Sequence, residues 1–382
     1  MQAALFSPMR LRSLTLRNRI VLAPMLTYQA RNGHVTDWHL AHLAKFATGG
    51  AGLVFMESTK VDPRGCTTAN DLGLWKDDFI KPLQRITRIL KEHGAAAGIQ
   101  LGHSGRKARN ALPWLGRQPI ADLPGVDHGE PWDLIGPSAI PHSPNYPIPR
   151  AMTSRDIAEQ IDCWAQATRR ADQAGFDVLE IHAAHGYLLH QFLSEDANQR
   201  DDAYGGSLQN RMRFPLEVVR TVRANWPADK PLFCRISAID EAGWRLEDSH
   251  VFVRALLAEG VDVIDCSAGG MTRRSIADPG PEAKLGYQVP YSQSIRSHTG
   301  AQTMAVGLII HADQADGILR DGAADLVALG RELLYNPNWP MDAASKLGIT
   351  QAFSMVPPSY GYWLEKRADA GFARATSTWP RH

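Results

Sequence analysis

Two histidines and a tyrosine lie close together in the phrase EIHAAHGY. His182 and His185 are three positions apart, and Tyr187 follows two positions later. The imidazoles could ligate a metal ion, could be core residues with satisfied hydrogen bonds, or could donate to a substrate oxygen with Tyr187 as a proton source. Spacing alone leaves these three interpretations open. A catalytic zinc would need a third protein ligand, and the absence of HxH and HExxH patterns leads us to predict no metal.

Polar side chains also stand within or at the ends of other apolar runs. Arg235 lies in PLFCRIS, so its side chain is expected to point inward, where a guanidinium needs an anionic partner. That partner could be a structural carboxylate, or it could be the N1/O2 edge of a flavin, which gains negative charge on reduction. Gln100 could hydrogen-bond the same edge, and Ser267 ends a further apolar run.

Glycines end two later apolar runs, at Gly307 and Gly330, and Arg331 follows the second. A glycine lets the backbone approach an anion closely. A helix that begins at Arg331 would add its positive end and a bidentate guanidinium to a phosphate site. Glycine is also common at strand ends for purely structural reasons, so the pattern is compatible with a phosphate site without requiring one.

The elements that would position these residues follow a repeated order, in which a helix ends at glycine and a buried strand comes next. The order recurs in AGFDVLEI (174–181), EGVDVIDC (259–266) and DGAADLVAL (321–329), and earlier in GGAGLVFME (49–57). Eight such strands with helices between them predict a (β/α)8 TIM barrel, whose catalytic groups gather at the carboxyl ends of the strands; an open doubly wound sheet is the alternative. The predicted strands are 19–24, 52–57, 97–101, 177–182, 231–236, 262–267, 302–306 and 325–329.

Helix boundaries are also visible in the sequence. Thr153 and Asp156 have the spacing of a capping box, and the helix that they begin is expected to close at Gly175. Ser207, in the phrase YGGSLQNR, could cap a further helix, which is a structural role rather than a chemical one.

Two segments depart from the alternating pattern. Residues 109–150 are rich in proline, glycine and tryptophan and follow the third strand, where a lid or pocket wall is expected; an irregular insertion without function is the alternative. We expect a single domain over residues 1–365, with a C-terminal extension, and a flexible tail over 366–382.

Composition excludes several classes of protein. The 382 residues are 44% hydrophobic with a formal net charge of +1, which allows a large core and argues against nucleic acid or an anionic membrane as partner. Apolar stretches are far shorter than the roughly 20 residues of a membrane-spanning helix, and the N-terminus has no secretory pattern. The scattered Cys66, Cys163, Cys234 and Cys266 form no CxxC pair, which excludes a local zinc or iron–sulfur motif and leads us to expect a cytoplasmic protein.

At these residues the chain resembles the Old Yellow Enzyme family of FMN-dependent ene-reductases, and within it the bacterial branch similar to xenobiotic reductases. The resemblance runs from about residue 5 to 365 and implies a TIM barrel that binds FMN. The matching phrases are LRNRIVLAPM (16–25), GIQLGHSGRKA (98–108), GPSAIP (136–141), AGFDVLEIHAAHGYLLHQFLS (174–194), YGGSLQNRMRF (204–214), LGYQVPYSQSIR (285–296) and ADLVALGRELL (324–334).

The resemblance implies that NAD(P)H reduces FMN and that flavin N5 then gives a hydride to the β-carbon of an activated alkene such as an enone. His182 and His185 would hold the activating oxygen, and Tyr187 would protonate the α-carbon. Tyr28 would line the substrate pocket, and Lys107 matches a basic position of unclear role. Flavin contacts are implied for Pro24, Met25, Leu26, Ser58, Gln100, His182, Arg235, Ser267, Gly307, Gly330 and Arg331.

The chain departs from the family pattern at several positions. Leu26 stands where relatives carry cysteine or threonine, and a leucine cannot hydrogen-bond the O4 region of the flavin. Glu195 replaces a proline, so we expect a local change in the loop around it. Tyr362 stands where some relatives have arginine, but Trp363 beside it could line the pocket of a neighbouring subunit. This segment predicts a homo-dimer or homo-tetramer.

Three functions follow from these residues. The first is an NAD(P)H-dependent ene-reductase acting on enones or related electrophiles. The second keeps the FMN barrel but reduces an aromatic or acyl-thioester intermediate of a catabolic pathway, which the 109–150 segment and Leu26 make credible. The third is a barrel that stores flavin or senses redox state without catalysis. A metal hydrolase is the weakest of the alternatives.

Overall fold

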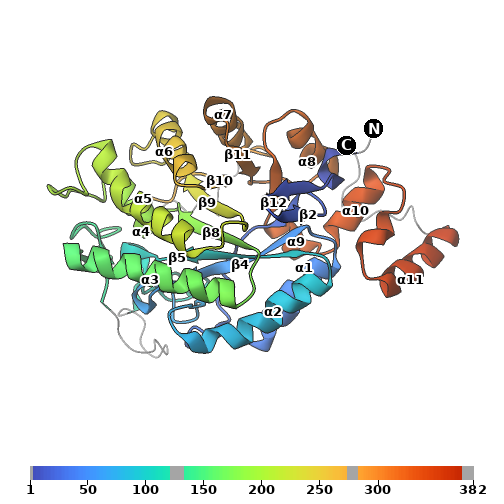
Figure 1. Cartoon of the computed structure of the whole chain (residues 1–382), viewed down its shortest axis with the longest axis horizontal. Coiled ribbons are helices and arrows are strands. Elements are labelled where there is room, and N and C mark those ends of the chain that lie inside the picture. The colour runs from blue at the N-terminus through green and yellow to red at the C-terminus, as the bar shows by residue number, and fades with distance from the viewer. Residues whose placement is uncertain (1–2, 121–132, 273–282, 372–382) are drawn as a thin grey trace.

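The computed structural model describes residues 3–120, 133–272 and 283–371. Its centre is a closed barrel of eight parallel strands, in which the last strand pairs with the first (Figure 1). All eight predicted strands are present, so the TIM barrel is confirmed and the doubly wound sheet is excluded. The barrel strands are β3 (Ile20–Leu22), β4 (Leu53–Lys60), β5 (Ala96–Gly102), β8 (Val178–Ala183), β9 (Leu232–Ser237), β10 (Val263–Ser267), β11 (Gln302–Ala305) and β12 (Leu326–Leu329).

Helices run between successive strands and cover the outside of the barrel (Figure 1). The predicted capping box is confirmed: the Thr153 hydroxyl accepts from the Asp156 N–H, and the Asp156 carboxylate accepts from the Thr153 N–H at 2.7 Å. Ser207 caps its helix by accepting from the Asn210 N–H. The helices that follow the successive barrel strands are α1 (Asp37–Thr48), α2 (Ile80–Glu92), α3 (Ser154–Gln173), α4 (Leu188–Leu193), α5 (Leu208–Asn225), α6 (Leu246–Ala258), α7 (Val289–Thr299), α8 (Ala312–Arg320) and α9 (Arg331–Tyr335).

Apolar side chains fill the amino end of the barrel interior. An antiparallel hairpin of β1 (Met9–Leu11) and β2 (Leu14–Leu16), which the sequence did not lead us to expect, closes this end. Its side chains pack against inward-facing residues near the starts of the strands, so the lower barrel is a solid core and a site can open only at the carboxyl end. This interior cluster consists of Met9, Leu11, Leu16, Val21, Ala23, Leu53, Phe55, Ala96, Val178, Phe233, Val263, Met304, Leu326 and Ala328.

Strand β4 contains a bulge that decides which of its residues face the barrel interior. Met56 pairs with Ile99 of β5 and Ser58 pairs with Gln100, so Glu57 is an extra residue in β4. Side chains alternate between the two faces of a strand, and one inserted residue reverses the alternation. The bulge therefore turns Ser58 inward, together with Lys60 at the end of the strand.

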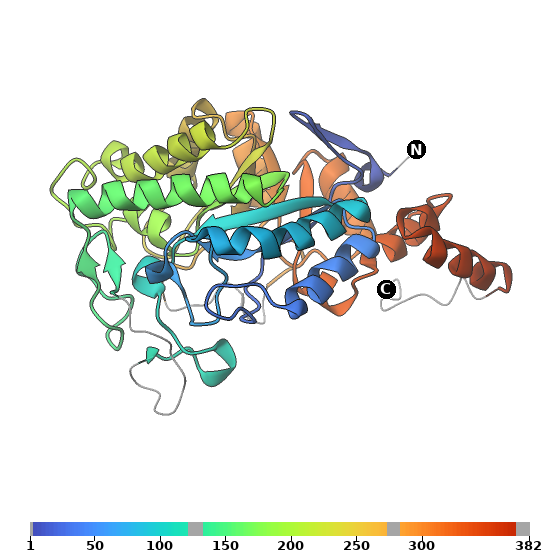
Figure 2. The same ribbon diagram turned by 60° about the horizontal axis from the view of Figure 1, so that its bottom comes forward.

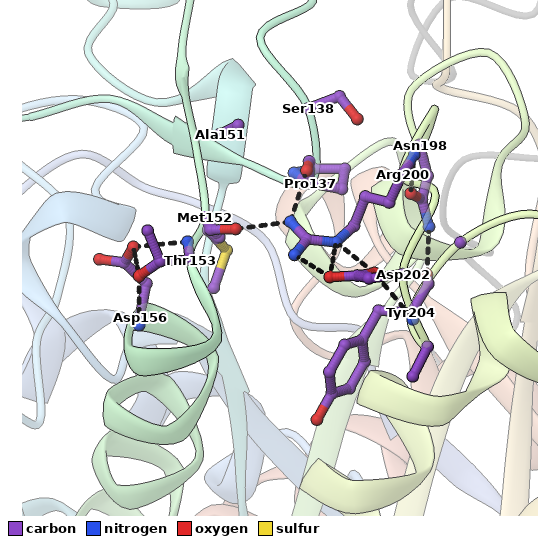
Figure 3. A network of polar contacts seen from close by, with 12 residues as sticks. Pro137, Ser138, Ala151, Met152, Thr153, Asp156, Asn198, Arg200, Asp202 and Tyr204 are labelled. Carbon is purple, nitrogen blue, oxygen red and sulfur yellow. Dashed lines mark hydrogen bonds and ion pairs between the residues drawn. The ribbon is translucent and has the colours of Figure 1, made fainter.

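Arg200, in the loop after α4, joins that loop to the base of the 109–150 segment (Figure 3). Its guanidinium donates to the carbonyl oxygens of Pro137 at 2.9 Å and Met152 at 2.5 Å and pairs with Asp202. The short parallel pair β6 (Ile135–Gly136) and β7 (Arg150–Ala151) closes the same base. Residues 121–132 of the predicted lid lie outside the described residues.

The C-terminal part of the chain adds two helices beyond the barrel, α10 (Trp339–Lys346) and α11 (Pro358–Asp369). In both views α11 projects from one side of the molecule (Figures 1 and 2). The tail was expected to begin at residue 366, but α11 continues through that position, and residues 372–382 lie outside the described range. Every helix in the described part of the chain is too short or too polar to cross a bilayer.

Phe233→Ala is expected to lower the free energy of unfolding by about 3–5 kcal/mol. Phe233 is fully buried in the barrel interior, 5.9 Å from the ring of Phe55, and neighbouring strands cannot move to fill the space that it would leave. Chemical denaturation of both proteins under identical buffer conditions measures the change. Ile148→Ala, at a 68% exposed position in the segment after the third strand, is the control and should change stability by less than about 0.5 kcal/mol. A loss below about 1 kcal/mol at Phe233 would contradict this description of the core.

Candidate active site

A cavity of about 1080 Å³ opens at the carboxyl end of the barrel. Its volume exceeds the usual range for a pocket that holds one small molecule, so a cofactor and a substrate can be held together. The cavity brings together nearly all of the residues that the sequence singled out. Those that line it are Pro24, Met25, Leu26, Tyr28, Ser58, Gln100, Lys107, His182, His185, Tyr187, Arg235, Ser267, Gly307, Gly330 and Arg331.

Arg235 is held at the cavity floor between two buried carboxyl groups. Its Nε lies 3.1 Å from Asp265, and Gln100 on the other side donates to Glu180 at 2.8 Å. Burial, and then repulsion from Asp265, raises the pKa of Glu180, and burial also raises the pKa of Asp265. The two acids therefore hold protons more tightly than exposed carboxyl groups do, and the guanidinium of Arg235 lies beside Asp265. It can attract an anionic edge of a bound ring.

The two histidines form a directed chain of hydrogen bonds. The Ala184 N–H lies 3.3 Å from Nδ1 of His182, which places the proton of that neutral ring on Nε2. Nε2 is 3.2 Å from Nδ1 of His185, and Nε2 of His185 is 2.8 Å from the Ser267 hydroxyl. Ser267 in turn donates to Gln288 at 3.2 Å. In this arrangement each Nε2–H donates within the chain, that of His182 to His185 and that of His185 to Ser267.

Both histidines are electrically neutral in this environment. Burial, and then the nearby charge of Arg235, lowers the pKa of His182 and of His185 well below the usual value for an imidazole. A neutral imidazole donates one hydrogen bond without adding a buried charge. The pair is therefore suited to polarising an oxygen atom, and the described residues hold no cluster of three or more metal-ligating side chains.

Tyr187 is the residue immediately before α4, beside the histidines. Its ring centroid is 4.8 Å from that of His182, and the ammonium of Lys107 lies 5.6 Å from the same ring. Lys107 donates to the carbonyl oxygens of His185 and Gly270, both at 2.9 Å. Burial lowers the pKa of Lys107 to about 8. Lys107, whose role was unclear from the sequence, therefore ties the two loops around Tyr187 together.

Two glycines bring bare backbone to the opposite wall of the cavity. Gly307 has a φ of +112°, and a Cβ there would lie 2.7 Å from Nε2 of Gln288. Gly330 precedes α9, whose first residue is Arg331. A backbone without side chains next to a guanidinium suits a phosphate, and Arg235 on the cavity floor suits the pyrimidine edge of a flavin. The residues present therefore fit FMN.

An aromatic wall stands above this cavity. Tyr28 contacts Trp114 edge to face with 5.8 Å between ring centroids, and burial is the main cause that raises the pKa of Tyr28. Leu26, which replaces a polar residue of the family pattern, lines the cavity as an apolar group. Trp363 lies on α11 with 69% of its surface exposed, and it is not among the described residues that line the cavity of its own chain.

Sequence reasoning missed several cavity residues. Gln288 lies in a phrase that matched the family but was assigned no role, and Trp114 lies in the irregular segment after the third strand. Lys60, which is fully buried and not part of the cavity lining, was also missed, although a charged residue at the end of the apolar run LVFMEST was a usable signal. Its inward direction depends on the bulge at Glu57, which the sequence pattern does not reveal.

Known proteins were compared with this chain. The sequence model of the NADH:flavin oxidoreductase / NADH oxidase family matches residues 4–349. The chain belongs to this family. An NADPH dehydrogenase of Geobacillus thermodenitrificans (strain NG80-2) is 45% identical over 353 residues, which are 91% of this chain and 96% of the relative. One of Listeria monocytogenes serotype 4a (strain HCC23) is 43% identical over 350 residues, with 91% and 96% covered.

Solved structures agree with the family assignment. Morphinone reductase is 25% identical with a TM-score of 0.73, and the match covers 92% of this chain and 91% of that one. A complex of 2-naphthoyl-CoA reductase has a TM-score of 0.80 at 24% identity; the match covers 91% of this chain but only 53% of that chain, and it shows the fold alone. The expected membership of the Old Yellow Enzyme family is confirmed. The protein is an NAD(P)H-dependent FMN oxidoreductase, which replaces the flavin-storage alternative.

Gly307→Ala is expected to weaken FMN binding at least tenfold, because alanine is strained at a φ of +112° and its Cβ would crowd Gln288. Fluorescence titration of the apoprotein with FMN measures the affinity. Gly300→Ala is a matched control: Gly300 has a φ of +74° at the end of α7, with no atom within 4 Å of an added Cβ. It should reproduce the backbone strain and leave FMN affinity unchanged. Equal FMN affinities in the two variants would contradict the assignment of Gly307 to the phosphate site of FMN.

Proposed function

We propose that this flavoenzyme reduces an activated carbon–carbon double bond, as in an enone. The observation that carries the proposal is the contact of Tyr187 with the linked, neutral pair His182 and His185 on one side of the cavity. Hydrogen-bond donors and a proton source are there combined within the reach of one small molecule. Bound FMN, once reduced by NAD(P)H, supplies the hydride.

In this proposal the histidines bind the activating oxygen of the substrate. The His182–His185 bond, at 3.2 Å, is longer than the 2.8 Å contact of His185 with Ser267 and is the easier one to exchange for a new acceptor. Negative charge accumulates on the substrate oxygen as hydride reaches the β-carbon. Donors that are already oriented stabilise this developing charge more than they stabilise the bound substrate. They therefore lower the activation barrier of the reduction.

Tyr187 would then complete the reaction by giving its hydroxyl proton to the α-carbon. Its ring is fixed by His182 and by the ammonium of Lys107, so that the phenol is held in place before the substrate arrives. Arg235 and Gln100 would hold the pyrimidine edge of FMN. The backbone at Gly307 and Gly330 would hold its phosphate.

A second candidate is reduction of an aromatic or acyl-thioester intermediate. The size of the cavity and its outer lining favour this alternative, because Trp114, His142 and Tyr146 extend the pocket beyond the space around Tyr187. Steady-state assays with cyclohexenone and with an aromatic thioester distinguish the two. Activity on the thioester and on no simple enone would replace the first proposal with the second.

The assembly and the compartment are also proposals. Tyr360, Tyr362 and Trp363 on the projecting α11 are 57%, 55% and 69% exposed, which suits an interface between copies of this chain in a homo-dimer or homo-tetramer. All four cysteines lie in the described residues and are free thiols, three of them buried, which fits the reducing cytoplasm.

Tyr187→Phe is expected to slow the oxidation of the reduced enzyme by cyclohexenone about a hundredfold, because the α-carbon loses its proton donor. Reduction of FMN by NAD(P)H should be unchanged. Stopped-flow absorbance of the flavin separates the two half-reactions. Equal losses in both would refute the role given to Tyr187.

The double variant His182→Ala and His185→Ala is expected to abolish the change that phenols produce in the flavin spectrum. The reason is that a phenolate oxygen would need the two Nε2–H donors. His142→Ala, at a third histidine of the cavity lining, is the control and should keep the change. An unaltered phenol titration in the double variant would argue against the oxygen-binding pair.

Trp363→Ala is expected to weaken self-association at least tenfold, because a large aromatic side chain would lose its buried contacts at the interface. Analytical ultracentrifugation over a range of protein concentrations measures the association. A wild-type protein that stays monomeric throughout would remove the proposed assembly.

A further inference from the structure

Lys60 places a fully buried ammonium beside Tyr187. The side chain is 0% exposed, and its Nζ lies 5.2 Å from the centroid of the Tyr187 ring. Nζ also donates to the Ser58 hydroxyl at 3.1 Å and lies 3.6 Å from the Asp71 carboxylate. Together with Lys107, which is 5.6 Å from the same ring, Lys60 gives this tyrosine two cationic neighbours.

Two local features of the barrel direct Lys60 to this position. The bulge at Glu57 turns the side chains of Ser58 and Lys60 inward. Lys60 pairs with Gly102 of β5, where a Cβ would lie 2.8 Å from Ser58 Oγ and 3.4 Å from His182 Cβ. Any residue larger than glycine at position 102 would crowd the side chains of Ser58 and His182. The fold therefore makes room for a long side chain at the inner end of β4.

Asp71 compensates only part of the cost of burying this charge. Its carboxylate accepts hydrogen bonds from the backbone N–H groups of Thr67 and Thr68 and from the Thr68 hydroxyl. These three donors share the negative charge of Asp71 with the ammonium of Lys60. A buried ammonium typically costs several kcal/mol unless its partners are close and well oriented. At 3.6 Å the pair leaves Lys60 with a positive field that reaches the neighbouring ring.

We propose that Lys60 is a positioning residue for the reaction, whose buried ammonium stabilises the phenolate that Tyr187 becomes when it gives up its proton. This inference rests on the proposed function, in which Tyr187 is the acid. The O–H bond of Tyr187 breaks, its electron pair stays on the phenolate oxygen, and a C–H bond forms at the α-carbon of the substrate. The phenolate then takes a proton from water, which restores the tyrosine.

The charge of Lys60 matters because burial lowers the pKa of both other basic side chains that contact the Tyr187 ring. Burial lowers the pKa of Lys107 to about 8, and it lowers the pKa of His182 well below its usual value. Burial, followed by repulsion from Tyr187 and Asp71, raises the pKa of Tyr28, so that tyrosine keeps its own proton. Several titratable and charged groups of the described residues lie near Tyr187 or Lys60. They are Tyr28 after β3, Lys60 on β4, Cys66 and Asp71 in the loop after β4, His103 and Lys107 after β5, and His182 and His185 at the end of β8.

The test is Lys60→Met, which keeps an unbranched chain and removes the charge. Oxidation of the reduced enzyme by cyclohexenone should slow about tenfold, which is roughly 1.4 kcal/mol. The phenolate would be less stable, so the alkaline fall of this rate should move up by about one pH unit. Reduction of FMN by NAD(P)H should be unchanged. Lys60→Gln, which keeps a donor for Ser58, is measured beside it in case the methionine variant does not fold.

Two further variants make the result specific to Tyr187. In a Tyr187→Phe background, Lys60→Met should cause no additional loss, because both changes act on the same proton transfer. Lys45→Met is the matched control, since its Nζ lies 4.9 Å from the ring of Phe46 on the outer helix α1, away from the cavity. It should leave both half-reactions and the pH profile as in the wild type.

Each outcome decides between the two proposals. A rate and pH profile like those of the wild type in Lys60→Met and Lys60→Gln would overturn the role of Lys60. A tenfold loss that persists in the Tyr187→Phe background would also overturn it, because Lys60 would then act by another route. If Tyr187→Phe alone leaves the alkene half-reaction intact, the proposed function fails first, whatever the lysine variants do.

Discussion

Closure of eight parallel strands into one barrel is the constraint on which the whole site depends. Closure sends alternate side chains of every strand into one shared interior, which holds apolar residues at the amino end and polar residues at the carboxyl end. The change comes within single strands: Phe233 and Arg235 face inward on β9, two residues apart. The same alternation gives Val263 and Asp265 on β10. The apolar cluster at the amino end of the barrel excludes water from that side. The polar side chains at the carboxyl end therefore lie in an environment of low dielectric constant.

The low dielectric explains the unusual protonation in the cavity. The same burial that keeps His182 and His185 neutral makes Glu180 and Asp265 hold their protons more tightly. Cations that remain charged there act over several ångströms, because little solvent screens them. In such a site a few fixed charges and donors have more influence on proton transfer than a larger number of exposed groups would have.

The bulge in β4 shows how one inserted residue changes the chemistry of the site. Without it, Glu57 and Thr59 would take the inward positions that Ser58 and Lys60 occupy. Glu57 instead faces away from that row, where it accepts hydrogen bonds from the backbone and the hydroxyl of Thr27. One irregularity therefore exchanges a buried carboxylate for a buried ammonium next to the cavity-lining Ser58 and Tyr187. It also anchors the loop that carries Tyr28.

Much of this arrangement could be predicted from the chain alone. Glycine-then-strand phrases located four of the barrel strands and further apolar runs located the other four, because a buried parallel strand needs a continuous apolar run whatever its neighbours are. The amino-terminal hairpin was missed, since its three-residue strands are too short to show an alternating pattern. The residues around the cavity were largely identified because they stand at the carboxyl ends of strands, or in phrases of the family.

The sequence by itself therefore determined the fold, the family and many of the polar residues of the cavity lining. Only the tertiary structure decided how those groups interact: the bond from His182 to His185, the two acids beside Arg235, and the direction of Lys60. The physical reason is that apolar periodicity is a local property of the chain, whereas strand register, a bulge and the protonation of buried groups depend on neighbours that are distant in sequence.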